Sequence, residues 1–442
     1  MRFSIIASVL LIASSVSAGP VWSNPSSSNL APLYVSNEAE TVSDSYIVVL
    51  KDHLTANHVE QHANWLQSMV KTKDRDLWLN EDRQSNTIRH VYETPSIRGY
   101  SGTFDNHILH QIRQSDDVAF VERDSMVYAS ELQRDAPWGL ARVSHREGLT
   151  LENKSTYDYS SQGGEGIKVY VIDTGINVDH ADFEGRATWG KTVPRGDPNA
   201  DGNGHGSHCA GTIAGKRFGV AKKAEPVAVK VLRSNGSGTM SDVISGVDWA
   251  TGEHIKAGTA AKKAGKTFKG SAANMSLGGG RSPSLDRFVN AAVEEGIVFA
   301  VAAGNDNSDA CDYSPAAAEL AITVGASTLY DDRAYFSNYG PCVDVFAPGM
   351  NILSVWKGGK NAVNTISGTS MASPHVAGLA AYFLSLEEGP VTPKEIKDKI
   401  LQLATKDALS KIPKDTPNLL IYNNYKPDEF TTQGLKAILG DI

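Results

Sequence analysis

The sequence predicts an α/β protein in which a parallel sheet with helices on both faces follows a small α+β domain. From residue 136 onward, short apolar segments alternate with helical segments, which is typical of a parallel sheet covered on both faces. Residues 45–128 differ, because strands and two helices with one apolar face follow one another there. The chain therefore combines two architectures.

The composition fits a protein with a sizeable buried core. Of the 442 residues, 41% are hydrophobic and 21% are charged, close to the averages of soluble globular proteins. At roughly 100–200 residues per domain, this length suggests two to four domains, or one large enzyme domain with an accessory domain. The formal net charge is −8, with no long run of Lys and Arg. We therefore expect no nucleic-acid partner and no electrostatic attachment to a membrane.

Residues 1–18 have the features of a secretory signal peptide. Arg2 precedes an apolar segment over residues 3–16, and small residues stand at the cleavage positions before and at Ala18. The apolar segment is shorter than the roughly 18–20 residues of a membrane span, so we expect no membrane anchor. Residues 19–44 are rich in Ser, Asn, Pro and Ala without hydrophobic periodicity, which predicts an unstructured spacer.

The small domain is expected to follow the order strand, helix, strand, strand, helix, strand. The strands are expected at residues 46–50, 88–92, 99–104 and 118–122. The first helix carries Val59, Ala63, Leu66 and Val70 on one face, and the second covers residues 106–115. This order is that of a ferredoxin-like domain.

The larger part is expected to form one parallel sheet. Its strands are expected at residues 167–172, 227–231, 273–277, 298–302, 321–324 and 419–422. Active groups of such sheets gather in loops at the carboxyl ends of the strands. Residues 425–442 follow as a C-terminal tail.

Four polar residues lie where an element ends or begins, so that each can be exposed and rigidly held. Asp173 ends an apolar strand in Val-Ile-Asp-Thr-Gly, and His205 opens a helix of small residues in Gly-His-Gly-Ser-His-Cys-Ala-Gly. Ser370 begins an Ala- and Gly-rich helix in Gly-Thr-Ser-Met-Ala, and Asn305 follows a strand in Ala-Ala-Gly-Asn-Asp. Singly, each has a structural explanation as a turn, cap or core residue. Together they supply an acid, a base, a serine nucleophile and an amide donor.

The chain order acid, base, serine is that of subtilisin, and the serine lacks the Gly-x-Ser-x-Gly elbow of esterases. With these motifs and residues 136–140, 274–280 and 336–340, the chain resembles subtilisin-like serine proteases of the fungal proteinase K and cerevisin group. The resemblance implies a catalytic domain over residues 129–424. It also implies that residues 45–128 are an inhibitory propeptide, which aids folding and is removed by self-cleavage.

The roles of the four residues follow from this resemblance. Ser370 would attack the scissile carbonyl, His205 would take its proton, and Asp173 would hold the imidazole in the correct tautomer. Asn305 and the Ser370 N–H would bind the oxyanion. The uncharged residues 126–130 fit the same cleft, and the cleaved bond is expected at Tyr128–Ala129.

Two glycine-rich segments resemble the recognition strands that pair with an extended substrate. The expected contact residues are Gly236, Ser237, Gly238, Ser276, Leu277, Gly278 and Gly279. Residues 278–280, with Ala303 and Gly304, would wall the pocket for the side chain that precedes the cleaved bond. Their small size predicts broad tolerance with a preference for large apolar or aromatic residues. These segments contain no acidic residue, so nothing in them indicates specificity for paired basic residues.

Three cysteines permit one disulfide and leave at least one free thiol. Polar, turn-rich surroundings favour a disulfide between Cys311 and Cys342. The resemblance implies the same pair, because the cysteine pattern looks like that of cerevisin and does not follow the disulfide pairs of proteinase K. Cys209, the free thiol, would lie one helical turn after His205, beneath the imidazole. A zinc site of His205, His208 and Cys209 would consume the base, so we do not expect it.

The resemblance implies no cofactor for the chemistry and one candidate structural calcium site. Asp344 aligns with the carboxylate ligand of the family, assisted by the carbonyl oxygens of Glu319 and Ala321. Asn153 lies in an Asn-x-Ser sequon and is an expected glycosylation site.

The sequence thus predicts a monomeric serine endopeptidase, made as a self-processing preproenzyme, that acts on proteins and peptides and is inhibited by its own propeptide. We expect the protein to enter the secretory pathway, and the sequence is compatible with both the vacuole and the cell exterior as its final location. An inactive subtilase-fold binding protein is the alternative, although it would be expected to lack a catalytic side chain.

Overall fold

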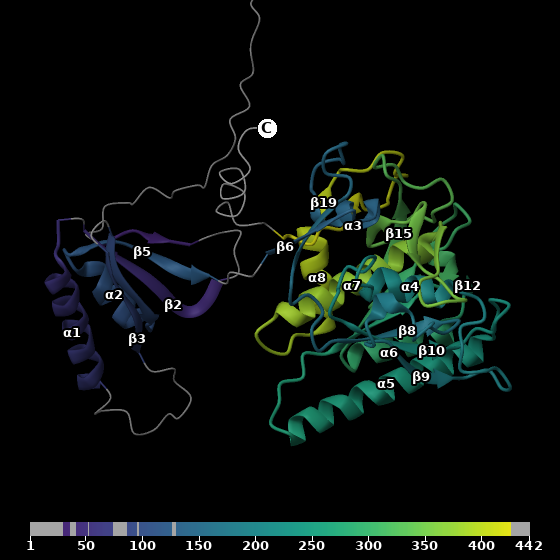
Figure 1. Cartoon of the computed structure of the whole chain (residues 1–442), viewed down its shortest axis with the longest axis horizontal. Coiled ribbons are helices and arrows are strands. Elements are labelled where there is room, and N and C mark those ends of the chain that lie inside the picture. Colours follow the sequence, from purple (N-terminus) through teal and green to yellow (C-terminus); the bar gives the residue numbers. More distant parts are fainter. Residues whose placement is uncertain are drawn as a thin grey trace, which may run out of the picture. The chain divides into compact units, whose positions relative to one another are not determined.

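The computed structural model describes residues 30–35, 41–51, 53–73, 86–94, 97–125 and 130–425. The chain divides into two compact units, Met1–Val127 and Tyr128–Ile442, which are described separately (Figure 1). The predicted signal peptide, the Tyr128–Ala129 bond and tail residues 426–442 lie outside the described residues, as does most of the spacer. No helix in the described part is both long and apolar enough to cross a membrane.

The first unit is a five-stranded sheet with two helices: the predicted order of elements, preceded by one additional strand. The prediction of an unstructured spacer over residues 19–44 is wrong at residues 33–34 and 41–44, which pair with strands of this sheet or extend one of them. Its elements are β1 (Leu33–Tyr34), β2 (Thr41–Leu50), α1 (Ala56–Lys73), β3 (Thr87–Thr94), β4 (Ile97–Thr103), α2 (Asn106–Gln114) and β5 (Val118–Ser125). The strand order is β1-β5-β2-β4-β3, and β1, which lies in the predicted spacer, pairs in parallel with β5. Leu66 of α1 and Ile112 of α2 share one core with Val48 and Val121 of the sheet, so both helices cover one face.

The second unit is built on a nine-stranded sheet, which confirms the predicted α/β architecture. Its strands are β8 (Lys168–Asp173), β9 (Thr188–Thr192), β10 (Glu225–Lys230), β11 (Ser271–Met275), β13 (Ile297–Ala302), β15 (Ile322–Ser327), β16 (Val345–Pro348), β19 (Thr405–Lys406) and β20 (Leu419–Leu420). The order is β19-β20-β16-β15-β13-β11-β8-β10-β9, and every pair except β19 with β20 is parallel.

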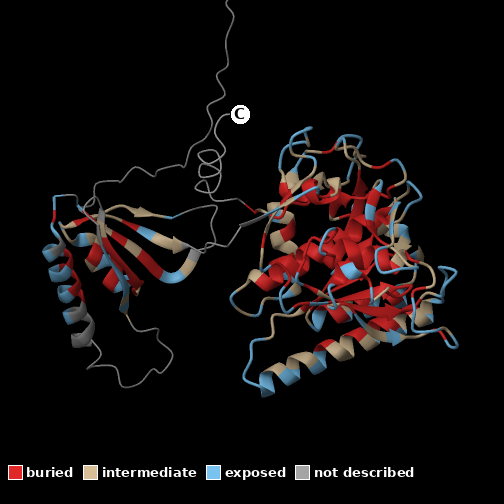
Figure 2. Cartoon of the chain, in the orientation of Figure 1, coloured by how far each residue is buried: buried red, intermediate tan, exposed pale blue. Residues whose placement is uncertain are grey.

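Helices cover both faces of this sheet and enclose two apolar cores (Figure 2). One core includes residues of α3 (Trp138–Ser144), α4 (His205–Ala214), α7 (Thr369–Leu386) and α8 (Pro393–Leu403), and the other includes residues of α5 (Met240–Lys263) and α6 (Pro283–Glu294). The Ala- and Gly-rich composition of α7 has a packing reason. A Cβ on Gly378 would lie 2.9 Å from Val220 Cβ and 3.1 Å from the Ile213 carbonyl oxygen of α4, so a larger residue would push these neighbours away from α7.

Short elements complete the second unit. They are β6 (Ser130–Arg134) paired with β7 (Thr156–Ser160), β12 (Gly279–Gly280) paired with β14 (Tyr313–Ser314), β17 (Ile352–Val355) paired with β18 (Val363–Ile366), and the 3₁₀ turns η2 (Ala181–Phe183) and η3 (Ala310–Asp312). Among the long strands, the order reverses beside β8, because β10 lies on one side of β8 and β11 on the other. The carboxyl ends of strands at such a reversal form a crevice in which ligands bind.

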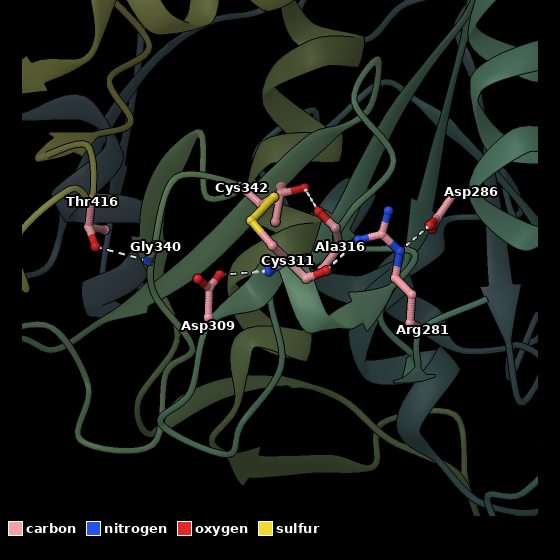
Figure 3. The surroundings of a disulfide bond; sticks show 9 residues. Arg281, Asp286, Asp309, Cys311, Ala316, Gly340, Cys342 and Thr416 are labelled. Atoms are coloured by element: carbon pink, nitrogen blue, oxygen red, sulfur yellow. Dashed lines mark hydrogen bonds and ion pairs between the residues drawn. A yellow bond between two sulfur atoms is a disulfide. The ribbon is translucent and has the colours of Figure 1, made fainter. Parts of the chain in front are cut away.

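The predicted disulfide is present between Cys311 and Cys342, with Cα atoms 5.3 Å apart (Figure 3). The loops around it are held by further bonds: the Cys311 N–H donates to Asp309 Oδ1 at 2.9 Å, and the Gly340 N–H donates to Thr416 Oγ1 at 2.9 Å. The bridge closes a segment with a sequence separation of 31. A disulfide that closes a loop of this length lowers the entropy of the unfolded chain, which stabilises the folded state by about 3–4 kcal/mol at 25 °C.

Candidate active site

Asp173 and His205 meet at the carboxyl end of β8. Asp173 is the last residue of this strand and is fully buried, and His205 is the first residue of α4. The two carboxylate oxygens lie 2.8 and 3.0 Å from His205 Nδ1. The Thr174 N–H also donates to Asp173 Oδ1, at 2.7 Å, which fixes the carboxylate plane. A carboxylate in this position keeps the imidazole proton on Nδ1 and leaves Nε2 to accept a proton.

A second carboxylate, which we did not predict, positions the start of α4. Asp201 Oδ1 accepts from the Gly204 N–H at 2.8 Å, and Asp201 Oδ2 accepts from the Ser207 N–H and hydroxyl at 3.0 and 2.6 Å. Thr174 links this cluster to β8, because its hydroxyl donates to Asp201 Oδ1 and accepts from the Gly206 N–H. Asp201 and Thr174 are therefore positioning residues for the imidazole.

The electrostatic surroundings of His205 favour its charged form. Burial disfavours the imidazolium, but the charge and hydrogen bond of Asp173, together with the charge of Asp201, outweigh burial and raise the pKa of His205 above its ordinary 6.5. A base with a raised pKa holds the proton that it takes from the nucleophile more readily.

Ser370 lies in the first turn of α7 and contacts the end of β11. Its hydroxyl donates to the Ser276 carbonyl oxygen at 3.1 Å, and no hydrogen bond joins Ser370 to His205 among the described side chains. A serine hydroxyl rotates to suit its partners, and the bond between nucleophile and base often forms only when substrate is bound.

The backbone of Ser370 is anchored outside its own helix. Pro374 stands four residues later in α7 and has no N–H, so the Ser370 carbonyl oxygen lacks its helical partner. Instead it accepts from the Ser276 hydroxyl at 2.7 Å and from the Cys209 thiol at 3.4 Å. The nucleophile is thereby tied to β11 and to α4.

Thr369, the residue before Ser370, holds the Asn305 side chain in one orientation. Asn305 follows β13, and its Oδ1 accepts from the Thr369 N–H at 2.8 Å and from the Thr369 hydroxyl at 3.0 Å. These bonds settle which side-chain atom is the oxygen, so Nδ2 faces away from Thr369 and is available to donate. Thr369, whose hydroxyl also accepts from the Gly304 N–H, is a further positioning residue that we did not predict.

A groove with a volume of 520 Å³ has His205 in its lining. All seven residues predicted to contact substrate line it: Gly236, Ser237, Gly238, Ser276, Leu277, Gly278 and Gly279. Leu232, Met240 and Val243, which we did not predict, add apolar side chains to its lining. Ala303 and Gly304 do not line this groove, and Ala303 is fully buried.

Cys209 is buried beneath the site. Its sulfur lies 4.0 Å from Asp173 Oδ2, and burial, reinforced by the Asp173 charge, raises the pKa of the thiol well above its usual range. The ligand atoms of Asp173, His205 and Cys209 lie within 4.8 Å of one another, but a metal there would take the base. His208 does not join them, because its Nε2 donates to the Ile352 carbonyl oxygen at 2.9 Å.

The three predicted calcium ligands come together, but around a lysine. Lys397 Nζ lies 3.1 Å from the Glu319 carbonyl oxygen, 2.7 Å from that of Ala321, and 2.9 and 3.0 Å from the oxygens of Asp344. These oxygens already bind a cation that is part of the chain. The arrangement of Asp344, Glu319 and Ala321 around Lys397 therefore does not fit the predicted calcium ion.

The Asp173–His205 pair at the lining of the groove, with a serine hydroxyl and an asparagine amide at the neighbouring helix start, is an arrangement typical of serine peptidases. The profile of the Subtilase family matches residues 164–421, and that of Peptidase inhibitor I9 matches residues 45–130. The chain is 56% identical over 421 residues to a subtilisin-like protease of Coccidioides posadasii, which covers 91% of this chain and 85% of the relative. It is 53% identical over 436 residues to alkaline protease 2 of Aspergillus fumigatus, covering 94% of this chain and 88% of the relative.

A solved structure of a cold adapted subtilisin-like serine proteinase is also similar, with a TM-score of 0.59 and 43% identity over 66% of this chain and 100% of that chain. The chain belongs to the subtilase family of serine proteases. Its first unit contains a propeptide domain of the I9 type.

Asn305→Ala is expected to lower kcat with little change in KM, because the lost N–H would bind charge that develops only in the transition state. In subtilisin, loss of the side-chain donor costs about 10²–10³ in kcat. Steady-state kinetics on a peptide substrate, beside the neighbouring exposed control Asp306→Ala, would measure the effect. A kcat near the wild-type value would contradict the role of Asn305.

Proposed function

We propose that this protein is a self-processing serine endopeptidase that cleaves after large apolar or aromatic residues. Ser370 attacks the peptide carbonyl, His205 takes the proton and passes it to the leaving amine, and Asp173 stabilises the imidazolium. The observation that carries this proposal is the pair of Asp173–His205 bonds, with His205 in the lining of the 520 Å³ groove. Residues such as alanine, glycine and proline have no side-chain group that holds or transfers a proton, so none of them could replace Asp173, His205 or Ser370.

The preference for apolar side chains is supported by the walls of the substrate site. Gly278 and Gly279, which follow β11, line the groove without a side chain, and Leu232, Met240 and Val243 contribute apolar side chains to its lining. Among the described residues that line the groove, His205 is the one titratable side chain. A site without a fixed charge favours uncharged side chains, since a buried unpaired charge is costly.

A set of peptides that differ in the residue before the cleaved bond tests this preference. We expect kcat/KM with Phe or Leu to exceed that with Asp or Arg by roughly 100-fold, because the charged side chain would lose its hydration without gaining a partner. Equal rates for Arg and Phe would contradict the proposed pocket. A protein that binds the peptides and hydrolyses none would support the alternative, an inactive binding protein.

The maturation scheme extends the same proposal. Residues 1–18 are the signal peptide, residues 19–44 a spacer, residues 45–128 the propeptide and residues 129–424 the catalytic domain, with cleavage at Tyr128–Ala129. This boundary is supported by β6, which begins at Ser130 and pairs with β7 inside the second unit. We place the protein in the secretory pathway, in the vacuole or outside the cell, as a monomer.

Glycosylation at Asn153 fits this route. Residues 151–155 form a turn, and the Asn153 side chain accepts from the Thr150 N–H through Oδ1 at 2.7 Å, which leaves its Nδ2 available. Asn274, in another sequon, is fully buried and bonded to Ser373 and is unsuited to a glycan.

A further inference from the structure

Three oxygen-bearing groups converge at one end of β15 and β16. The Glu319 and Ala321 carbonyl groups belong to the turn that enters β15, and Asp344 directly precedes β16. The Asp344 carboxylate is held in place by the Thr323 N–H, which donates to Oδ2 at 2.8 Å, and the Asp344 N–H donates to the Thr323 carbonyl oxygen at 2.9 Å. The strands thus hold three oxygen-bearing groups around one negatively polarised pocket, without the help of a cation.

Helix α8 delivers Lys397 to this pocket. A capping box fixes its start, where the Thr392 side chain accepts from the Glu395 N–H and the Glu395 side chain accepts from the Thr392 N–H. Ile396 and Ile400 are buried in the core, so the rotation of the helix is also fixed. Lys397 follows Ile396, and its side chain is 18% exposed.

We propose that the Lys397 ammonium group is a built-in replacement for a bound calcium ion at this position. An ammonium group has three N–H donors, and three acceptor groups surround it: two carbonyl oxygens and one carboxylate. Their distances of 2.7–3.1 Å are those of N–H···O bonds, whereas calcium requires 6–8 oxygens at 2.3–2.6 Å. Every donor is used, and no ligand is left for an ion.

Charge leads to the same conclusion. Lys397 Nζ lies 2.9 and 3.0 Å from the two carboxylate oxygens of Asp344, so the ammonium group supplies the positive charge that balances this carboxylate. A calcium ion in the same pocket would face the ammonium group at short range. The site therefore contributes stability without depending on the calcium concentration.

Calcium binding by the full chain with Ser370→Ala, which prevents self-digestion, tests the proposal. Equilibrium dialysis should give the same number of bound calcium ions with and without Asp344→Asn. Lys397→Met, which keeps the aliphatic stem, should bind one more calcium ion, and adding Asp344→Asn to it should remove that ion. In EDTA, Lys397→Met should lower Tm by about 4 °C, because a half-buried carboxylate loses its partner, and calcium should restore it.

Lys394→Met is the matched control, since Lys394 lies on the same helix, is 81% exposed and pairs with Asp398 on the surface. It should change neither calcium binding nor Tm. Loss of one bound calcium on Asp344→Asn alone would overturn the proposal, because the site would then hold calcium despite Lys397. A Lys397→Met protein with unchanged calcium binding and unchanged Tm would overturn it as well.

Discussion

Full-length protein that carries Ser370→Ala is expected to keep residues 45–128 attached, whereas wild-type protein is expected to begin between Ala129 and Glu131. Alanine has no oxygen to attack the junction, and the carbonyl oxygens of Ser276 and residue 370 cannot take over this role. Intact mass and N-terminal sequencing of both purified proteins measure the difference. The effect is all or none, which makes it the largest that we expect.

Addition of a small amount of wild-type enzyme provides the control. The Ser370→Ala protein should then be cut at the same bond, which shows that its junction is intact and reachable. Equal processing of wild-type and variant protein without this addition would mean that another protease matures the chain, and self-cleavage by Ser370 would be wrong.

Asp173→Asn is expected to lower kcat by about 10⁴-fold while the fold is kept. The reason lies in the Thr174 N–H, which donates to Oδ1 of residue 173 at 2.7 Å. An asparagine that keeps its oxygen toward this N–H places its NH₂ where Oδ2 lies, 3.0 Å from His205 Nδ1, so that an amide N–H opposes the proton on Nδ1. The imidazole proton moves to Nε2, where it blocks proton transfer from Ser370. Steady-state kinetics, beside the exposed control Asp248→Asn, would measure the loss.

The pH profile separates this mechanism from simple misfolding. His205 must be neutral to act as a base, so kcat/KM of the wild type should fall with decreasing pH through the raised His205 pKa, above 6.5. In Asp173→Asn the favourable charge is gone and burial remains, so the residual activity should fall at a lower pH than in the wild type. An unchanged acid limb would contradict the proposed coupling.

The sequence was sufficient to predict the strands that consist mostly of apolar residues and the position of Asp173 at the end of one of them, beside His205. It was not sufficient for β9 and β16. The first, Thr-Trp-Gly-Lys-Thr, mixes polar and apolar residues, and the second is four residues long and ends in Pro348. Both are recognised as strands only through their pairing with β10 and β15.

The supporting residues of the site were hidden for a different reason. Asp201 lies among Asp, Gly and Asn, where a carboxylate has the pattern of an ordinary turn residue. Four of its five accepted bonds come from Asn203, Gly204 and Ser207, as in such a turn, whereas the bond that links it to Thr174 spans 27 residues. Lys397 has the pattern of an exposed helix residue, and its partners lie more than 50 residues earlier in the chain. Such contacts are tertiary and leave no local signal.

The missing N–H of Pro374 determines how the catalytic turn can open. A helix start whose bonds lie within the helix frays alone, at little cost in free energy. The Ser370 carbonyl oxygen is instead bonded to Ser276 and Cys209, so this turn separates only together with β11 and α4. Proteolysis requires a segment to unfold locally before it can enter another molecule's cleft. Among many copies of itself, the enzyme is therefore protected from digestion at the turn that carries Ser370, because this turn cannot unfold alone.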